Sequence, residues 1–419
     1  MSERSVDYDL MVIGAGAIGV TIAMNAAERG LSTAVVEARA EPGMGCSYAN
    51  AGLLAPSHAH PLTGFGNVRA GLRNIANPYG PFKLDPSAEN ISWIPRFLLA
   101  SLPREHDKAI DTQRRLSGAS TAMHRSMARS GLDTGFRQNG LLDVYRNLTA
   151  AQATTDDLEN HPLRPAFSLL SAAQIMEKIP TAAGLEAGVF TTDDAHCDGY
   201  RYVHAVAERA AELGVDFRFN APAGALLRRN AVTRGVSTSV GDLSANHTVV
   251  AAAEPSKRLL KPTGLHLPMI NGKGYVVDLA KSSSDPGFPI GIKDEMIVAT
   301  PYPDRLRLAG VMELTGSDDS VDATRVGAMI TAGESVFPGL SSRDILESWA
   351  GLRPCIADGL PAVGRTHDPG LSVATGHGQQ GLVLAPITSA IVQAQLQGQP
   401  GTPAGVDPHA ISPERFRKR

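Results

Sequence analysis

The hydrophobic pattern of the first forty residues alternates between short apolar runs and a longer helical one. Residues 8–13, YDLMVI, form an apolar run of strand length, and residues 32–36 form a second one. Between them, residues 20–30, VTIAMNAAERG, have a helical pattern that ends at a glycine. This order predicts a strand, a helix and a strand, which is the βαβ unit of a parallel sheet.

A glycine motif joins the first predicted strand to the helix. Gly14, Gly16 and Gly19 have the spacing GxGxxG, and Glu37 directly follows the second strand. The first glycine permits a tight turn, the second lets the backbone approach a pyrophosphate, and the third lets the helix pack closely on the strand. Glu37 can accept hydrogen bonds from ribose hydroxyls and argues against a 2′-phosphate. We therefore predict a dinucleotide site, although the motif alone does not distinguish NAD from FAD.

The stretch after the second strand favours FAD over NAD. Residues 37–61 are loop-like and rich in small residues, whereas an NAD enzyme is expected to continue to a third strand and helix. Ser47, Asn50 and Gly52 lie where the far end of a larger cofactor is expected.

A second glycine-rich junction near the C-terminus also favours FAD. Residues 376–381 read GHGQQG, between a short β-branched run and an apolar, helical stretch at 382–398. Three glycines in six residues suggest backbone that lies close to a ligand. Such a junction offers an isoalloxazine ring a backbone wall and a helix dipole end, which stabilises negative charge on the reduced ring. An unrelated glycine turn is the alternative.

The middle of the chain predicts further helices and strands. Residues 93–131 have helical periodicity, and residues 135–146 read as a β-hairpin with Asn139-Gly140 as its turn. Residues 196–220 predict a helix followed by a strand, and residues 243–253 another buried strand.

Composition and charge exclude several classes of protein. The 419 residues are long enough for two domains, are 43% hydrophobic and carry a formal net charge of −3, which gives no reason to expect nucleic acid. Cys46, Cys197 and Cys355 lie far apart, so we expect neither a disulfide framework nor a metal site. The chain shows no signal-peptide pattern and no apolar run of membrane-spanning length, so we expect a cytoplasmic protein.

Several segments together carry a family resemblance. In chain order they read DYDLMVIGAGAIG, CSYANAGLLAP, NGKGYVVDL, LAGVMELTG, SWAGLRPCIADGLPAVG and ATGHGQQGLVLAP, and they extend from residue 8 to about residue 395. With them the chain resembles the D-amino acid oxidase superfamily of flavoproteins, and most closely the bacterial D-amino acid dehydrogenases. The resemblance implies noncovalent FAD. Cys355 lies close enough to the flavin region to raise covalent attachment as the less favoured alternative.

The resemblance also implies a fold and a domain organisation. It implies an α/β protein with a Rossmann-like FAD-binding domain assembled from discontinuous segments, and an α+β substrate domain whose mixed sheet lies over the flavin ring. We expect the FAD-binding domain to comprise residues 1–65, 191–261 and 346–419. The substrate-binding domain is expected to comprise residues 66–190 and 262–345.

We expect the cofactor to be bound by the two glycine-rich junctions and by the segment after the second strand. The expected FAD-binding residues are Gly14, Gly16, Ala17, Ile18, Gly19, Glu37, Ala38, Arg39, Ser47, Asn50, Ala51, Gly52, Gly376, Gly378, Gln379, Gln380 and Gly381.

Oxidation of an amino acid by hydride transfer depends mainly on orientation of the substrate. Arg353 is the candidate for holding the carboxylate, since the arginine of the GLRP motif does so in the resembling family; a structural arginine is the alternative. Tyr275 is a second candidate for the carboxylate, or else a core aromatic. His377 is expected to pack or hydrogen-bond near the ring, with a role as a base not required. His58 and His60 are assigned no role.

One segment departs from the family pattern. Many relatives have Ala-Gly-x-Trp-Ser where residues 252–256 read AAEPS. Alanine in place of glycine at position 253 is expected to shift the backbone near the cofactor, and Pro255 replaces a large aromatic residue.

These observations predict an FAD-dependent dehydrogenase of amino acids, favouring D-amino acids, with D-proline or hydroxy-D-proline as options. The imine product would hydrolyse to a 2-oxo acid and ammonia. The resemblance implies electron transfer to a quinone or another acceptor, and hence peripheral association with the inner membrane. The alternatives are an oxygen-using oxidase of glycine or sarcosine, an NAD(P)-dependent reductase, and a catalytically silent flavin-binding interaction protein. The sequence does not indicate an oligomeric state.

Overall fold

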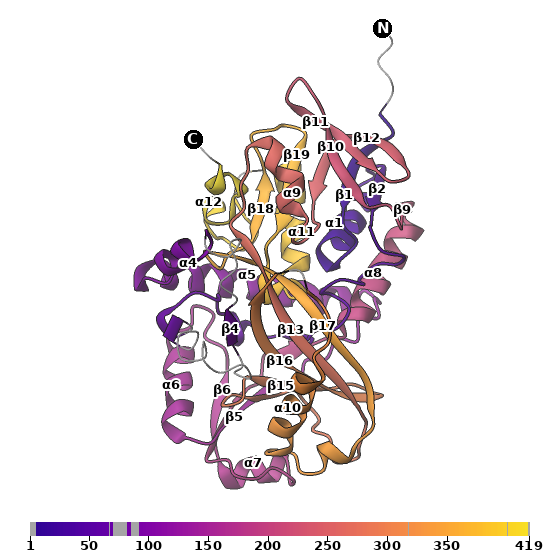
Figure 1. The fold of residues 1–419 in the computed structure, drawn as a ribbon. Coiled ribbons are helices and arrows are strands. Elements are labelled where there is room, and N and C mark those ends of the chain that lie inside the picture. Colours follow the sequence, from indigo (N-terminus) through magenta and orange to yellow (C-terminus); the bar gives the residue numbers. More distant parts are fainter. Residues whose placement is uncertain are drawn as a thin grey trace.

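Two large β-sheets divide the molecule, with one in the upper half of Figure 1 and the other in the lower half. The structure is a computed structural model, and it describes residues 6–66, 68–69, 82–84, 92–316, 318–399 and 401–417. The two sheets contain eight and nine strands within these ranges. The predicted α/β fold, with a Rossmann-like half and a half built on a mixed sheet, is confirmed.

The first sheet is assembled from segments far apart in the sequence. Its central strands β9, β2, β1, β12 and β19 are parallel, β18 pairs antiparallel with β19, and β10 and β11 extend it beyond β12. The strands are β1 (Tyr8–Ile13), β2 (Thr33–Val36), β9 (Asp216–Arg218), β10 (Ala223–Arg229), β11 (Val232–Thr238), β12 (Gly241–Val250), β18 (Ala362–Arg365) and β19 (Leu371–Thr375). Strands β1, β2 and β19 are largely buried, as are the last three residues of β12, because helices and loops cover both faces of this part of the sheet.

Three helices pack against one another beside this sheet and form its main core. Helix α1 (Ala17–Ala27) contacts both α8 (Gly199–Glu212) and α11 (Ala385–Leu396). Ile22, Val206 and Ile391, one residue from each helix, belong to a single buried cluster. The predicted βαβ unit at the N-terminus is therefore confirmed, as is the helix-then-strand order within residues 196–220.

The second sheet is mixed, as predicted. Its strand order is β17-β13-β16-β15-β14-β5-β7-β6, with β4 paired to β16; β14 runs parallel to β5, and β4 parallel to β16. The strands are β4 (Phe82–Leu84), β5 (Leu141–Tyr145), β6 (Phe167–Ser171), β7 (Ala187–Thr191), β13 (Met269–Ala280), β14 (Ile290–Ile292), β15 (Ile297–Pro301), β16 (Arg305–Thr315) and β17 (Ile345–Ile356). Helices α6 (Leu148–Glu159), α7 (Ala172–Lys178) and α10 (Ala323–Glu334) pack beside it.

The predicted hairpin at residues 135–146 is wrong. Gly140 has the positive φ of a turn residue, at +83°. Strand β5, however, pairs with β7 and β14, and Arg137 forms a bridge to His196. Gly140 thus has the φ that favours glycine, but residues 138–140 form no turn, and the partners of the flanking residues come from distant segments.

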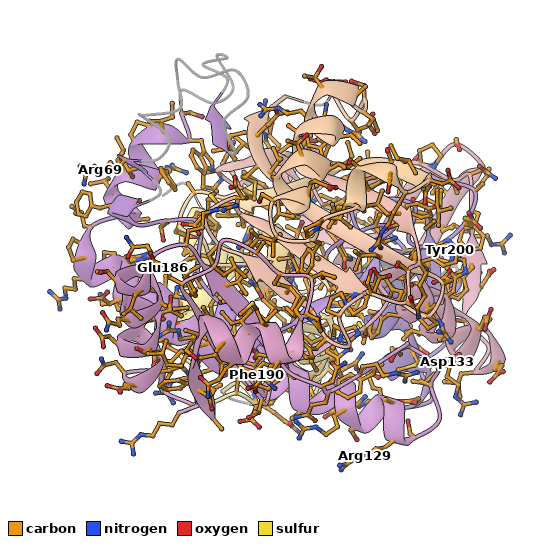
Figure 2. All side chains as sticks on the ribbon, turned by 90° about the horizontal axis from the view of Figure 1, so that it is seen from below. Arg69, Arg129, Asp133, Glu186, Phe190 and Tyr200 are labelled. Carbon is orange, nitrogen blue, oxygen red and sulfur yellow. The ribbon has the colours of Figure 1, made fainter. Side chains whose placement is uncertain are left out.

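The long helical segment at 93–131 is split, because a proline begins the second helix. The segment forms α4 (Ile94–Ala100) and α5 (Pro103–Arg129), with Pro103 at the first position of α5. Helix α5 packs against α11 of the first half. Just beyond α5, Asp133 forms an ion pair with Arg201 of α8, and Figure 2 shows Asp133 and Tyr200 at the same edge of the molecule.

The sheets suggest a refinement of the expected domain boundaries. The expected boundary at residue 346 falls at the start of β17, and all of β17 pairs with β13 of the second sheet. We propose that the division follows the sheets, with β17 in the substrate-binding half.

None of the helices in the described ranges combines the length and apolar character that a membrane span needs.

Ala253, in the segment that departs from the family pattern, adopts a backbone conformation that favours glycine. Its φ is +52°. Its carbonyl oxygen accepts hydrogen bonds from the Thr375 hydroxyl and from the backbone N–H of Ser256, at 3.1 Å each. These bonds hold the residue in the left-handed region, which costs an alanine about 1–2 kcal/mol.

We expect Ala253→Gly to raise the free energy of unfolding by up to about 1 kcal/mol, because the relief of strain exceeds the added chain entropy of glycine. The same change at Ala183, an exposed loop residue without a positive φ, should lower it by roughly 0.5–1 kcal/mol. The midpoints of urea unfolding of both variants check this. A loss of stability in both would contradict it.

Candidate active site

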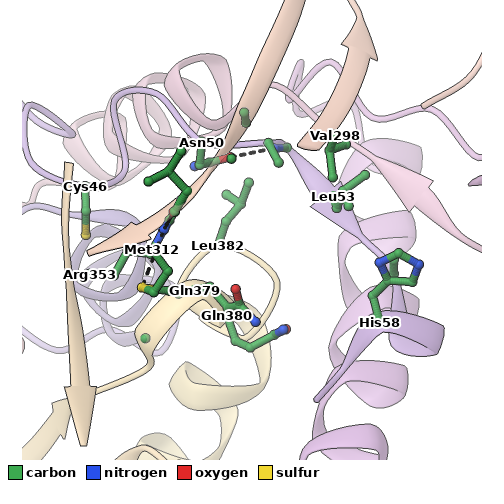
Figure 3. A pocket seen from close by; sticks show the side chains of 18 of the residues that line it. Cys46, Asn50, Leu53, His58, Val298, Met312, Arg353, Gln379, Gln380 and Leu382 are labelled. Carbon is green, nitrogen blue, oxygen red and sulfur yellow. Dashed lines mark hydrogen bonds between the residues drawn. The ribbon is translucent and has the colours of Figure 1, made fainter. Parts of the chain in front are cut away.

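A cavity of about 290 Å³ is lined by segments from both halves of the molecule (Figure 3). Its lining comes from residues 46–58, from β15, β16 and the turn before β15, from Arg353 of β17, and from the second glycine junction. The cavity brings together nine of the predicted site residues, namely Ser47, Asn50, Ala51, Gly52, Arg353, Gly378, Gln379, Gln380 and Gly381.

In the first glycine motif the fold requires Gly14 and Gly19, whereas Gly16 leaves space for a ligand. A Cβ on Gly19 would lie 1.9 Å from the carbonyl oxygen of Gly14, and a Cβ on Gly14 would lie 2.6 Å from that of Ala251. The nearest atom to a Cβ on Gly16 is the Ser47 hydroxyl oxygen, at 3.4 Å. Gly16 therefore keeps free a space at the N-terminus of α1, where N–H groups and the helix dipole attract phosphate.

Glu37 is held against this motif. Its carboxylate accepts hydrogen bonds from the backbone N–H of Ala15 at 2.7 Å and of Arg39 at 3.0 Å. Because each carboxylate oxygen can accept more than one hydrogen bond, a ribose hydroxyl can still bind there. The space beside Gly16 and this fixed carboxylate fit the pyrophosphate and ribose of FAD. Ala38 and Arg39 follow as exposed residues.

The second glycine junction is explained partly by packing. Gly376 has φ +79°, and a Cβ there would lie 2.1 Å from the side chain of Ile356 in β17. This glycine thus lets the two halves approach. Residues 378–380 form a short 3-10 helix at the cavity, and α11 begins at Ala385, three residues later than the predicted helical stretch.

His377 is buried at the second glycine junction. Its Nε2 lies 2.9 Å from the hydroxyl of Thr388, and its backbone forms a bridge to Cys355. Burial lowers the pKa of His377 to about 3. The imidazole is therefore neutral and structural, in agreement with a packing role.

Arg353 is a cation without a carboxylate partner among the described residues. Its Nη1 donates to the backbone oxygen of Val311 at 3.0 Å, and burial lowers its pKa. The guanidinium lies directly over Gly274 of β13, where a Cβ would be 2.1 Å from Nη2. A positive charge held in a cavity in this way calls for an anion, and a carboxylate matches the fork of an arginine.

A β-bulge in β16 positions the acceptor for Arg353. Lys273 pairs with Glu313 but Tyr275 pairs with Gly310, so two residues of β16, Val311 and Met312, lie opposite Gly274. Val311 has φ +65°, a strained conformation for a β-branched residue that costs roughly 1–3 kcal/mol. The bulge brings the Val311 carbonyl to the guanidinium.

The structure does not place Tyr275 in the cavity. Its side chain is buried in the core of the second half, and its hydroxyl donates to Oε2 of Glu313 at 3.1 Å. Successive residues of a strand face opposite sides of the sheet, so Gly274 faces Arg353 and Tyr275 faces away. The structure thus places Tyr275 in the core, which was the alternative given for it, and Gly274 is the residue of the Lys-Gly-Tyr segment that lies beneath the Arg353 guanidinium.

His58, which was assigned no role, does line the cavity (Figure 3). Its Nε2 lies 2.7 Å from Oδ2 of Asp143 in β5. No signal in the sequence links these residues, which are 85 positions apart. The described residues contain no group of three or more His, Cys, Asp or Glu side chains suited to a metal ion.

Comparisons with known proteins agree with this geometry. The model of the DAO family, described as FAD dependent oxidoreductase, matches residues 9–395. A Paramagnetospirillum magneticum protein named D-amino acid dehydrogenase is 30% identical over 93% of this chain and 95% of its own length. A Cereibacter sphaeroides protein of the same name is 30% identical over 93% of this chain and 92% of its own length. The crystal structure of glycine oxidase from Geobacillus kaustophilus, which is 21% identical, has a TM-score of 0.74 and covers 96% of this chain and 99% of that one. It shares the fold.

The two glycines at the start of α1 should respond differently to alanine. We expect Gly16→Ala to fold normally but to bind FAD roughly 10- to 100-fold more weakly, because its Cβ fills the space kept for phosphate. Gly19→Ala should lose stability even without FAD, because its Cβ overlaps a backbone carbonyl. Flavin fluorescence titration and thermal unfolding of the apoproteins measure the two effects. Equal FAD affinity in Gly16→Ala and wild type would contradict this assignment.

Proposed function

The chain belongs to the DAO family of FAD-dependent oxidoreductases, and we propose that it oxidises a D-amino acid by moving a hydride from Cα to FAD. The observation that carries this proposal is the unpaired Arg353 in the cavity. Support for the D-configuration comes from the relatives named D-amino acid dehydrogenase. D-Proline and hydroxy-D-proline are among the substrates we propose to test.

Arg353 fixes the carboxylate of the substrate in this proposal. A bidentate pair sets a plane as well as a charge, so it orients Cα relative to the flavin. The Val311 carbonyl accepts a hydrogen bond from the guanidinium, and the absence of a side chain at Gly274 leaves room for it. Leu53, Val298 and Met312 give the cavity apolar walls that exclude water (Figure 3).

FAD supplies the two-electron acceptor when it is bound. The substrate amine must be unprotonated when the hydride leaves, since its lone pair forms the imine. The imine then hydrolyses to a 2-oxo acid and ammonia, or remains cyclic when the substrate is a proline.

We propose that the FAD-binding residues are those predicted from the two glycine junctions and the segment between Glu37 and Gly52. Noncovalent binding agrees with the state of Cys355. Burial raises the pKa of its thiol to about 12, although Arg353 opposes the shift. The thiol is therefore protonated and unreactive at neutral pH.

The electron acceptor we propose is a quinone or another acceptor in place of oxygen, with peripheral association at the inner membrane where the quinone is found. Support comes from the relatives that carry the name dehydrogenase. Fast aerobic production of peroxide would identify an oxidase instead.

The proposal is tested by the visible absorbance of the bound flavin under anaerobic conditions. D-amino acids, L-amino acids, D-prolines, glycine and sarcosine are added one at a time. We expect rapid bleaching by at least one D-amino acid or D-proline and none by its L-enantiomer. A yellow protein that no compound bleaches would show that the substrate class is wrong.

Arg353→Ala should lower kcat/KM by roughly 100-fold or more, chiefly through KM, because about 3 kcal/mol of charge pairing with the carboxylate is lost. Gly274→Ala should raise KM at least about tenfold, since its Cβ displaces the guanidinium. Gly327→Ala, on the open face of α10, is the control and should stay within about twofold. Steady-state kinetics with the substrate found above measure kcat and KM of the three variants. An unchanged KM in Gly274→Ala would refute the assignment of Arg353.

A further inference from the structure

The cavity has a second polar wall that the proposed function leaves unassigned. His58 ends the short helix η1 (Pro56–His58), and in Figure 3 it lies across the cavity from Arg353. Its Nε2 contacts the Asp143 carboxylate, which can only accept a hydrogen bond when ionised. The Nε2 atom therefore carries a hydrogen, so Nδ1 carries the lone pair whenever the ring is in its neutral form. Nδ1 makes no hydrogen bond to any other described residue.

Asp143 is built into the sheet as a fixed, ionised support. Its Oδ1 lies over Gly291 of the neighbouring strand β14, where a Cβ would be 2.1 Å away. Lys293 Nζ lies 3.7 Å from Oδ2. Burial alone would raise the pKa of Asp143, but its hydrogen bond with His58 and the nearby Lys293 ammonium group hold it below its ordinary value. A buried carboxylate behind an imidazole fixes the ring and makes its other nitrogen a better proton acceptor.

We propose that His58 accepts the proton that the substrate's ammonium group must lose before the hydride can leave Cα. Asp143 is the positioning residue behind it. The ammonium N–H bond breaks, an Nδ1–H bond forms, and the positive charge moves to the imidazole, where the Asp143 carboxylate offsets it. The electron pair of that N–H bond stays on nitrogen as the lone pair that forms the imine. This inference rests on the proposed function, because it requires an amine substrate in the cavity.

Two of the ionisable groups around His58, Asp194 and His60, keep their charge above about pH 7. Burial raises the pKa of Asp194, which is bonded to Ser57, to about 6. Burial and the nearby Arg114 lower the pKa of His60 to about 4. Asp143 and Lys293 complete the set that faces the ring. Above about pH 7 Asp194 is thus ionised and His60 neutral, so neither of them contributes to a pH profile taken there.

The test is the limiting rate constant of anaerobic flavin reduction, measured between about pH 7 and pH 10.5 with the substrate found above. His58→Gln keeps a donor for Asp143 but lacks the base, and His58→Asn serves as a second variant. We expect both to be slower than wild type by roughly 100-fold near pH 7.5, the lower end for a lost general base. The deficit should shrink to within about threefold at pH 10.5, where amines are largely unprotonated without help. Added imidazole should restore part of the rate near pH 7.5.

Asp143→Asn and a matched surface pair complete the design. Asp143→Asn makes Nδ1 of His58 a weaker proton acceptor, so we expect the rate constant of flavin reduction to fall roughly tenfold near pH 7.5. The acidic limb of its pH profile should move to lower pH, whereas the acidic limb of the His58→Gln profile should move to higher pH. His367→Gln breaks a surface histidine–carboxylate pair with Glu414 and should leave the profile unchanged.

Two results would overturn the inference while the proposed function stands. One is a wild-type pH profile in both His58 variants, and the other is a deficit of equal size at pH 7.5 and pH 10.5, which marks a purely structural role. If no amino acid reduces the wild-type flavin, the proposed function itself fails and the inference fails with it.

Discussion

The pairing of β13 with β17 is the constraint on which the site depends. Along this pair Gly272 is opposite Arg353 and Gly274 is opposite Gly351, so one face of β13 has no side chains at the cavity. Arg353 and Cys355 occupy the space that these glycines leave. At the end of the pair, Ile356 is opposite Met269 and packs against Gly376, which brings the second glycine junction to the cavity. One pair of strands thus places Arg353, the cavity floor and the second glycine junction relative to one another.

At two places in the second sheet a charged side chain lies over a glycine of the neighbouring strand. Arg353 lies over Gly274, and Asp143 lies over Gly291, in each case on the neighbouring strand. A charged side chain that lies flat on a glycine cannot rotate toward solvent without losing the contacts around it. Both charges are therefore fixed before any ligand arrives, which reduces the reorganisation that binding and reaction would otherwise require.

Local patterns predicted what depends on local sequence. The βαβ unit, its glycine motif and Glu37 follow one another within thirty residues, so periodicity and spacing were sufficient. The β-hairpin failed because its partner strands are separated from it by tens of residues or more. Tyr275 was chosen for its chemistry, but the alternation of side chains along β13 decides which residue faces the cavity, and that depends on the pairing with β17. His58 could not be found because Asp143 becomes its neighbour only in the folded sheet.

The discontinuous first sheet has a consequence for how the chain is made. Strand β1 is translated before its neighbour β12, which ends at Val250, and the next strand, β19, begins only at Leu371. Helix α1 packs against α11, which begins at Ala385. The nucleotide-binding half therefore cannot fold completely until β19 and α11 have been synthesised. Until then its apolar strands stay exposed, because their partners lie hundreds of residues downstream. Loss of the segment from β18 onward would remove two strands at one end of the sheet together with α11 and the second glycine junction, so a shortened chain is left without a complete N-terminal half.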